Sequence, residues 1–146
     1  MKSGSVLDIQ LVDMHGNPLA MPDISVDVVL YSGGQERYRF DAGATDAQGC
    51  ISTSHDMLER TRKENQAFAL MDYNTKLEDC EDTIGLAVPT LDQLRERLAA
   101  VRKWFPENEP KLSERVKDSK NGNVAASGIK KVVTNGSRMT VQLPVK

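Results

Sequence analysis

The sequence predicts a mainly β protein, an antiparallel β-sandwich of seven or eight strands with one inserted amphipathic helix. Two observations lead to this fold class. Apolar and polar residues alternate in several short stretches, which is the period-2 pattern of strands with one buried face. Turns rich in glycine, asparagine, aspartate and proline separate these stretches. The 146 residues are enough for one domain with its own core, so we treat 1–146 as a single domain.

Four of the expected strands lie in the first third of the chain. Residues 6–13 and 24–32 show the clearest alternation, and Gly16-Asn17-Pro18 turns the chain between them. A third strand at 37–40 should place Tyr38 and Phe40 in the core. The Thr45-Asp46-Ala47-Gln48-Gly49 turn then leads into a short strand at 50–53.

The middle of the chain is expected to add two more strands and a short surface helix. Residues 54–64 are polar and tolerate a helix of one to three turns. Residues 66–72 and 83–88 are predicted to form strands, the second with one buried face.

The clearest helix is predicted at 90–105. Thr90 and Gln93 fit a capping box at its start, and Pro106 ends it. An apolar stripe follows the helical spacing and comprises Leu91, Leu94, Leu98, Val101 and Phe105. Such a stripe needs a partner. We favour packing against the sandwich, and the alternative is docking on a second chain, which would give a homodimer through the helix.

The last part of the chain is expected to be a loop followed by a hairpin. Residues 107–128 are charged and rich in small residues, so we interpret them as a flexible loop. Residues 129–134 and 138–145 flank Asn135-Gly136, which is a strong signal for a two-residue hairpin turn. The hairpin would close the sandwich with Val132 opposite Met139.

The composition narrows the classes of partner. Apolar residues make up 39% and charged residues 27% of the chain, and the formal net charge is −2. Because there is no basic excess, a nucleic-acid partner is not expected. No apolar stretch is long enough for a signal peptide core or a membrane span, so membrane insertion is not expected, and the compartment stays open.

Two cysteines and two histidines are the only candidates for nucleophilic or zinc chemistry. Cys50 and Cys80 are compatible with one disulfide or with two separate thiols, and we favour separate thiols. A thiol nucleophile needs an imidazole within hydrogen-bond reach, and His15 and His55 are isolated from both cysteines in sequence. Zinc ligands usually occur in pairs at short spacing, which this chain lacks.

An acidic run raises the question of calcium. It consists of Glu78, Asp79, Glu81 and Asp82, with Asp72 and Asn74 nearby. Lys76 stands where a calcium loop would place its third oxygen ligand. We therefore expect a solvated acidic loop and no metal or other cofactor.

Three segments resemble a known family: Leu11-Val12-Asp13-Met14-His15-Gly16-Asn17-Pro18-Leu19, then 24–30, then Thr45-Asp46-Ala47-Gln48-Gly49. Together they are similar to the carboxypeptidase-regulatory-like domains of transthyretin-like (prealbumin-like) β-sandwiches. The resemblance implies this fold and carries no catalytic residues. Residues 20–23 and the 90–105 helix depart from the family pattern. The chain also ends Leu143-Pro144-Val145-Lys146, unlike the hydrolases of this fold, which end Tyr-Arg-Gly-Ser.

These observations favour a non-enzymatic protein-interaction or adaptor module, which could belong to a larger surface or secretion-associated assembly. Its contact surface would be an exposed strand edge or the 90–105 helix. The candidate residues on the helix are Leu91, Leu94, Arg95, Leu98, Val101, Arg102 and Phe105. Two alternatives remain: a small hydrolase that uses Cys50 or Cys80 with a histidine, and a structural spacer domain.

Overall fold

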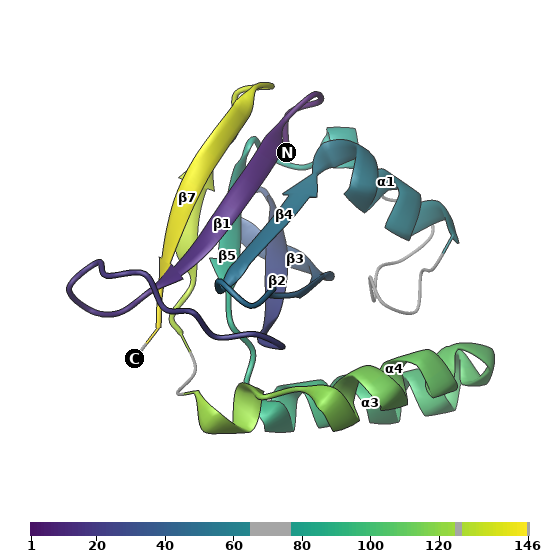
Figure 1. Ribbon diagram of the computed structural model, residues 1–146. Helices are drawn as coiled ribbons and strands as arrows, with labels where there is room; N and C mark the ends of the chain where they lie inside the picture. Colours follow the sequence, from purple (N-terminus) through teal and green to yellow (C-terminus); the bar gives the residue numbers. More distant parts are fainter. Residues whose placement is uncertain (65–76, 125–126, 146) are drawn as a thin grey trace.

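The computed structural model describes residues 1–64, 77–124 and 127–145, and within them two β-sheets face each other (Figure 1). One sheet has the strand order β4-β1-β7 and the other β3-β2-β5-β6. The strands are β1 (Val6–Val12), β2 (Ser25–Ser32), β3 (Gln35–Ala44), β4 (Cys50–Ser54), β5 (Thr83–Ala87), β6 (Lys130–Val133) and β7 (Arg138–Pro144). The described part therefore has seven strands in two sheets, as the sequence indicated.

Three α-helices accompany these strands in the described residues: α1 (His55–Glu64), α3 (Leu91–Trp104) and α4 (Glu109–Asp118). Short 3-10 turns lie at Leu77–Asp79, Pro106–Asn108 and Asn121–Asn123. The expectation of a mainly β chain with one inserted helix is therefore wrong, and the architecture is mixed α/β. The strand expected at 66–72 lies outside the described residues.

The core lies between the two sheets and follows the period-2 pattern. Leu7, Ile9 and Leu11 of β1 meet Val28 and Leu30 of β2 in one apolar cluster. Tyr38 and Phe40 are buried in the same cluster, which confirms their predicted placement. Alternate side chains of a strand point to opposite faces, so one row of each strand enters the core.

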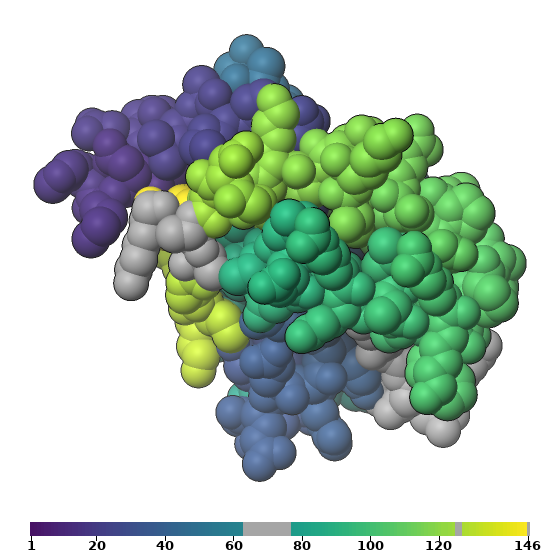
Figure 2. Space-filling view, turned by 90° about the horizontal axis from the view of Figure 1, so that it is seen from below, coloured from purple at the N-terminus to yellow at the C-terminus, as the bar shows by residue number. Residues whose placement is uncertain are grey.

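Strand β2 is buried on its second face as well. Its polar positions Ser25 and Asp27 are as inaccessible as its valines. Helices α3 and α4 lie side by side over one end of the molecule, which Figure 2 shows from below. The alternation of apolar and polar residues in β2 predicts that its second face is in contact with solvent. In the structure the helical layer covers this face at Ser25 and Asp27.

Helix α4 occupies the segment where a flexible loop was expected. Leu112 is buried against Leu98 and Val101 of α3, with Phe105 and Val116 packed at the margin of this second small core. The segment contains few apolar residues, but two of them, four positions apart, face the α3 stripe. The capping box at the start of α3 is present as predicted, with both the Thr90 and Gln93 side-chain bonds formed.

The predicted hairpin around Asn135-Gly136 is not formed. Strand β6 pairs with β5, whereas β7 pairs in parallel with β1 along its whole length, so the link crosses from one sheet to the other. Val132 lies opposite Ile84 and not opposite Met139. The turn is held by the N-terminal segment, since the Gly136 N–H donates to Ser5 Oγ at 2.8 Å. The expectation of a wholly antiparallel sandwich is corrected by the same β1–β7 pairing.

Gly49 allows the chain to turn into β4. Its φ is +75°, and its N–H donates to the Asp46 carbonyl at 3.0 Å. A Cβ at this position would lie 1.9 Å from the Leu19 carbonyl oxygen. Gly16 has a similar φ of +83° but has no atom within 4 Å of its Cβ position.

We expect Gly49→Ala to destabilise the fold by about 3 kcal/mol or more, because positive φ and backbone overlap act together. Gly16→Ala should cost about 1 kcal/mol, since it carries only the positive φ. Urea unfolding followed by circular dichroism measures both. Equal losses would contradict the close approach of Gly49 to Leu19.

We expect Leu112→Ala to cost about 2–5 kcal/mol, because it leaves a cavity between α3 and α4. Its exposed neighbour gives the control, and Lys111→Ala should change stability by less than about 0.5 kcal/mol. Urea unfolding and limited proteolysis at 107–124 report the effect. A Leu112→Ala protein as stable as Lys111→Ala would mean that α4 does not contribute to the fold.

Candidate functional site

The structure buries the apolar part of the helical surface that the sequence singled out. Leu94, Leu98 and Val101 are inaccessible to solvent, and Leu91 and Phe105 are half-buried. Burial of Leu94 and Leu98 is confirmed, but Leu98 packs on Leu112 of α4 and not on the sandwich as expected. Arg95 and Arg102 stay exposed and pair with Asp92 and Glu109. Within the described residues the helix α3 thus presents charged side chains and Trp104 at its end, not its apolar stripe.

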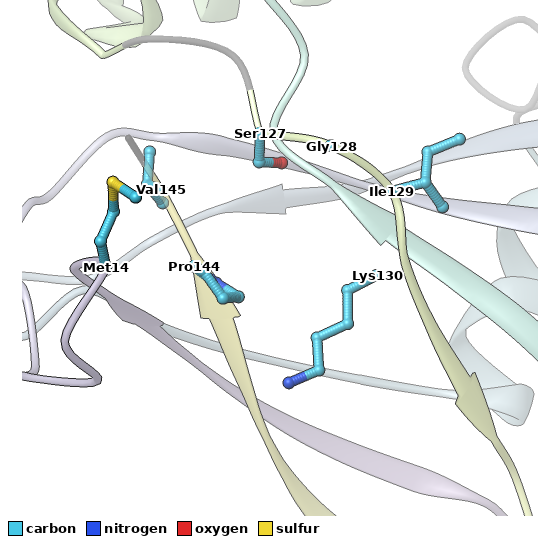
Figure 3. A pocket seen from close by; sticks show the side chains of 7 residues that line it. All are labelled: Met14, Ser127, Gly128, Ile129, Lys130, Pro144 and Val145. Atoms are coloured by element: carbon cyan, nitrogen blue, oxygen red, sulfur yellow. The ribbon is translucent and has the colours of Figure 1, made fainter.

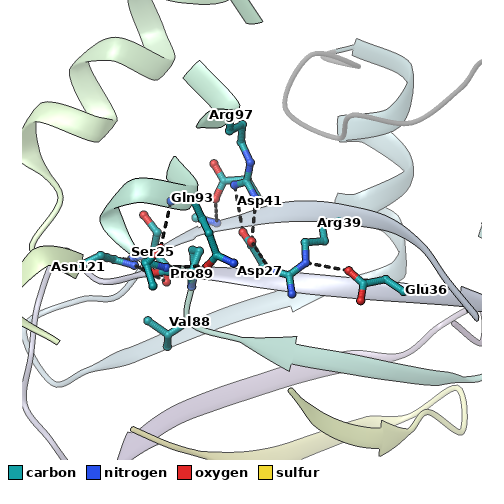
Figure 4. A network of polar contacts seen from close by, with 12 residues as sticks. Ser25, Asp27, Glu36, Arg39, Asp41, Val88, Pro89, Gln93, Arg97 and Asn121 are labelled. Carbon is teal, nitrogen blue, oxygen red and sulfur yellow. Dashed lines mark hydrogen bonds and ion pairs between the residues drawn. The ribbon is translucent and has the colours of Figure 1, made fainter. Parts of the chain in front are cut away.

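A buried ion pair joins α3 to the sheet. Asp27 of β2 is 0% exposed and accepts two hydrogen bonds from the Arg97 guanidinium, at 3.1 and 2.7 Å (Figure 4). Arg39 of β3 lies 3.6 Å from the same carboxylate and also bonds Glu36 at 2.9 Å. A two-bond arginine–carboxylate pair fixes distance and orientation together. It therefore sets where α3 lies on β2.

Asn121 and Arg115 attach the segment that follows α3 to strands β2 and β3, close to the Asp27–Arg97 pair. The Asn121 side chain accepts the Ser25 N–H at 2.7 Å and donates to the Pro89 carbonyl at 2.7 Å. Arg115 of α4 forms an ion pair with Asp41 of β3. Burial lowers the pKa of Arg115, and the charge of Asp27 opposes that shift. Each carboxylate in this network has an arginine partner, so we assign the network a role in positioning the helices.

The cysteines show no sign of activation. The Cys50 thiol donates to Gln10 Oε1 at 2.8 Å. Burial raises the pKa of both thiols, with Asp46 adding to the shift at Cys50. A nucleophilic cysteine needs the opposite shift. His55 follows the far end of β4, five residues after Cys50, which along an extended strand is a separation of about 16 Å. The two thiols are not joined by a disulfide.

The acidic run Glu78, Asp79, Glu81 and Asp82 is exposed, as expected of a solvated loop. Residues Leu77–Asp79 form a 3-10 turn, and the Glu81 carboxylate accepts the Gly34 N–H at 3.2 Å. The Asp82 carbonyl accepts the Thr134 N–H at 3.0 Å. No cluster of three or more histidine, cysteine or acidic side chains with metal-binding geometry occurs in 1–64, 77–124 and 127–145. Asp72 and Asn74 lie outside these ranges.

An apolar hollow lies between the two sheets, where the end of β7 faces the start of β6 (Figure 3). Its volume is about 480 Å³. The lining residues are Met14, Ser127, Gly128, Ile129, Lys130, Pro144 and Val145. Met14 is 74% exposed, so an apolar side chain meets solvent in this hollow, whereas the Ile129 side chain, 39% exposed, points to the other face of the sheet.

The strand β6 borders this hollow with an unpaired edge. The Thr134 N–H bonds to the Asp82 carbonyl, and the pairs Ile84–Val132 and Leu86–Lys130 follow at intervals of two. Antiparallel pairing alternates, so the backbone groups of Lys131 and Val133 point away from β5. Val133 is 64% exposed. This edge is where β6 could accept another strand.

Gly85 lets Ile129 lie across the outer face of the sheet. A Cβ on Gly85 would stand 2.6 Å from Ile129 Cγ2 and 3.0 Å from the Tyr31 hydroxyl. The Lys131 amine lies 4.9 Å from the centre of the Tyr31 ring, at the distance of a cation–π contact. Sequence reasoning placed 129–134 in a hairpin and so missed this edge. Met14, an apolar residue in a polar turn, was the available signal.

Comparison of the chain with protein-family models, with curated proteins and with solved structures finds no match. None of the helices in the described residues combines the length and apolar character that crossing a bilayer requires.

We expect Asp27→Asn to destabilise the fold by about 3–5 kcal/mol, because it leaves the Arg97 charge buried without a carboxylate. Asp92 also pairs with an α3 arginine but is exposed, so Asp92→Asn should cost no more than about 1 kcal/mol. Urea unfolding at neutral pH compares them. Similar losses in the two variants would refute the assignment of Asp27 as the attachment point of α3.

Proposed function

We propose that the chain is a non-enzymatic protein-interaction module whose contact surface is the open edge between β6 and β7. The observation that carries this proposal is the apolar hollow of about 480 Å³ beside the unpaired edge of β6. Apolar hollows of roughly this size are typical of binding sites. Exposed apolar residues that gather at one place mark interaction sites more often than scattered ones do.

The fold supports an edge more than a helix as the contact surface. The apolar stripe of α3 is buried within the same chain, with Leu98 and Val101 packed on Leu112 of α4. A homodimer through that stripe would first require α4 to leave. The edge at β6 needs no such rearrangement, because β6 is the last strand of its sheet and Val133 is exposed.

We extend the proposal to the transthyretin-like resemblance. Two facing sheets with seven described strands are compatible with it, and the Asp46–Gly49 turn occurs as the resemblance implies. On that basis the chain would act as an adaptor appended to a larger surface or secretion-associated assembly. The raised thiol pKa values argue against the hydrolase alternative.

The test uses peptides selected from a random phage-displayed library on the folded protein. Met14 and Trp104 are both exposed large apolar residues, at 74% and 67%, on different parts of the molecule. We expect Met14→Asp to weaken binding of the selected peptides about tenfold or more, because it places a charge in the apolar hollow. Trp104→Asp is the matched control and should bind as the original protein does.

Isothermal titration calorimetry measures both affinities, and circular dichroism confirms that both variants fold. Loss of binding in Trp104→Asp alone would move the contact surface to the end of α3. A protein that selects no peptide above background would be a structural spacer, and the interaction proposal would fail.

A further inference from the structure

We infer that the partner at this surface is an extended segment of another protein with alternating acidic and apolar side chains, which adds to the sheet β3-β2-β5-β6 as a strand next to β6. The inference rests on the proposed function and specifies its ligand. It draws on three features of the β6 edge: its free backbone groups, the two faces of the strand, and its charge.

The backbone of β6 offers a hydrogen-bonding edge. Lys131 and Val133 direct both N–H and C=O away from β5, as the alternating pairs require. An added strand takes up these groups in the same spacing as a neighbouring strand of a sheet. Because β6 has only four residues, the contact involves a short segment and not a long edge.

The two faces of β6 differ. Val132 packs toward the core, and Lys130 points the same way, since its neighbour Leu86 lies in the core. Ile129, Lys131 and Val133 face outward beside Tyr31. Side chains of an added strand alternate between the same two faces. Its inward residues would enter the hollow near Met14, Pro144 and Val145, and an apolar residue suits that lining.

The positive charge of the β6 edge favours acidic residues at the outward-facing positions of the added strand. Lys130 and Lys131 are adjacent, and neither takes part in an ion pair among the described contacts. The Lys130 amine donates to a neutral acceptor, the Gln142 carbonyl, at 2.8 Å. A carboxylate is a stronger acceptor for an ammonium group than a carbonyl is. An outward Glu or Asp of the added strand would lie on the same face as Lys131, whose amine lies over the Tyr31 ring, and would gain a charge-assisted bond from that amine.

The same charge argues against a second copy as the occupant. Pairing β6 with β6 of another copy would bring four lysines into one four-residue contact. Like charges placed close together across a strand pair are destabilising. The edge therefore suits a partner of opposite charge better than it suits itself.

The probe is a capped eight-residue peptide that alternates valine and glutamate. Lys131→Pro is the sharp variant, because the Lys131 N–H points to the open edge and its loss removes no bond to β5. Thr140→Pro is the matched control on β7. The Val6 N–H donates to the Ser137 carbonyl, and the Val145 N–H donates to the Val12 carbonyl. Every second residue of β7 therefore bonds to β1, and Thr140, which lies between such residues, directs its N–H away from β1.

We expect the probe to bind the original protein and Thr140→Pro alike, and to lose about tenfold or more in affinity for Lys131→Pro. A peptide with lysine in place of glutamate should bind about tenfold more weakly than the probe, with the difference shrinking at high salt. Titration calorimetry gives the affinities. Amide hydrogen exchange should show new protection at Lys131 and Val133 on binding, and circular dichroism checks the fold of both proline variants.

The outcomes separate the inference from the proposed function. Equal binding to Lys131→Pro and the original protein, or tighter binding of the lysine peptide, would overturn the inference. If the probe fails while phage-selected peptides bind in a Met14-dependent way, the inference is wrong and the interaction module stands. If neither binds, both fail. Self-association that Lys131→Pro abolishes, seen by analytical ultracentrifugation, would make a second copy the occupant and overturn the acidic segment.

Discussion

The placement of the helical layer depends on the ion pair between Asp27 and Arg97. A carboxylate that is fully buried in a central strand is tolerated only with a partner, because an unpaired charge in the interior costs several kcal/mol. The partner comes from α3, 70 residues further along the chain. The pair does not need to add net stability to matter. Its two-bond geometry allows α3 one position on β2, and α4 follows because Leu112 packs on Leu98 and Val101.

This arrangement decides which surface is left for a partner. Once α4 covers the apolar stripe of α3, that helix presents charged residues and Trp104 to solvent. Beside the helical layer, β7 joins β1 in parallel and β6 joins β5, and the two strands face each other across a hollow without pairing. The open edge is thus a consequence of topology. Chain connectivity places β6 and β7 in different sheets although four residues link them.

A few side-chain contacts determine the properties of the open edge of β6. Gly85 leaves room for Ile129 on the outer face, and Tyr31 holds the Lys131 amine above its ring. Lys130 reaches across to the Gln142 carbonyl and so links the two sheets. Lysines and a short length also protect an edge from pairing with any strand it meets. The same features that limit unspecific pairing would select a partner that carries carboxylates.

Local rules determined much of the fold from the sequence alone. The alternation in β1 and β2, the turn at Gly49 and the capping box of Thr90 and Gln93 depend on neighbours within a few residues, so their patterns could be interpreted directly. Tertiary structure decided the rest. Helix α4 has a buried face only because Leu98 and Val101 of α3 pack against its Leu112. The segment 107–128 contains too few apolar residues for its sequence alone to indicate a packed helix. The Asn135-Gly136 turn predicts a hairpin locally, but pairing of β7 with all seven residues of β1 is the stronger contact. The candidate site combines segments near residues 14, 130 and 144, and no local pattern reports how segments so far apart in sequence meet.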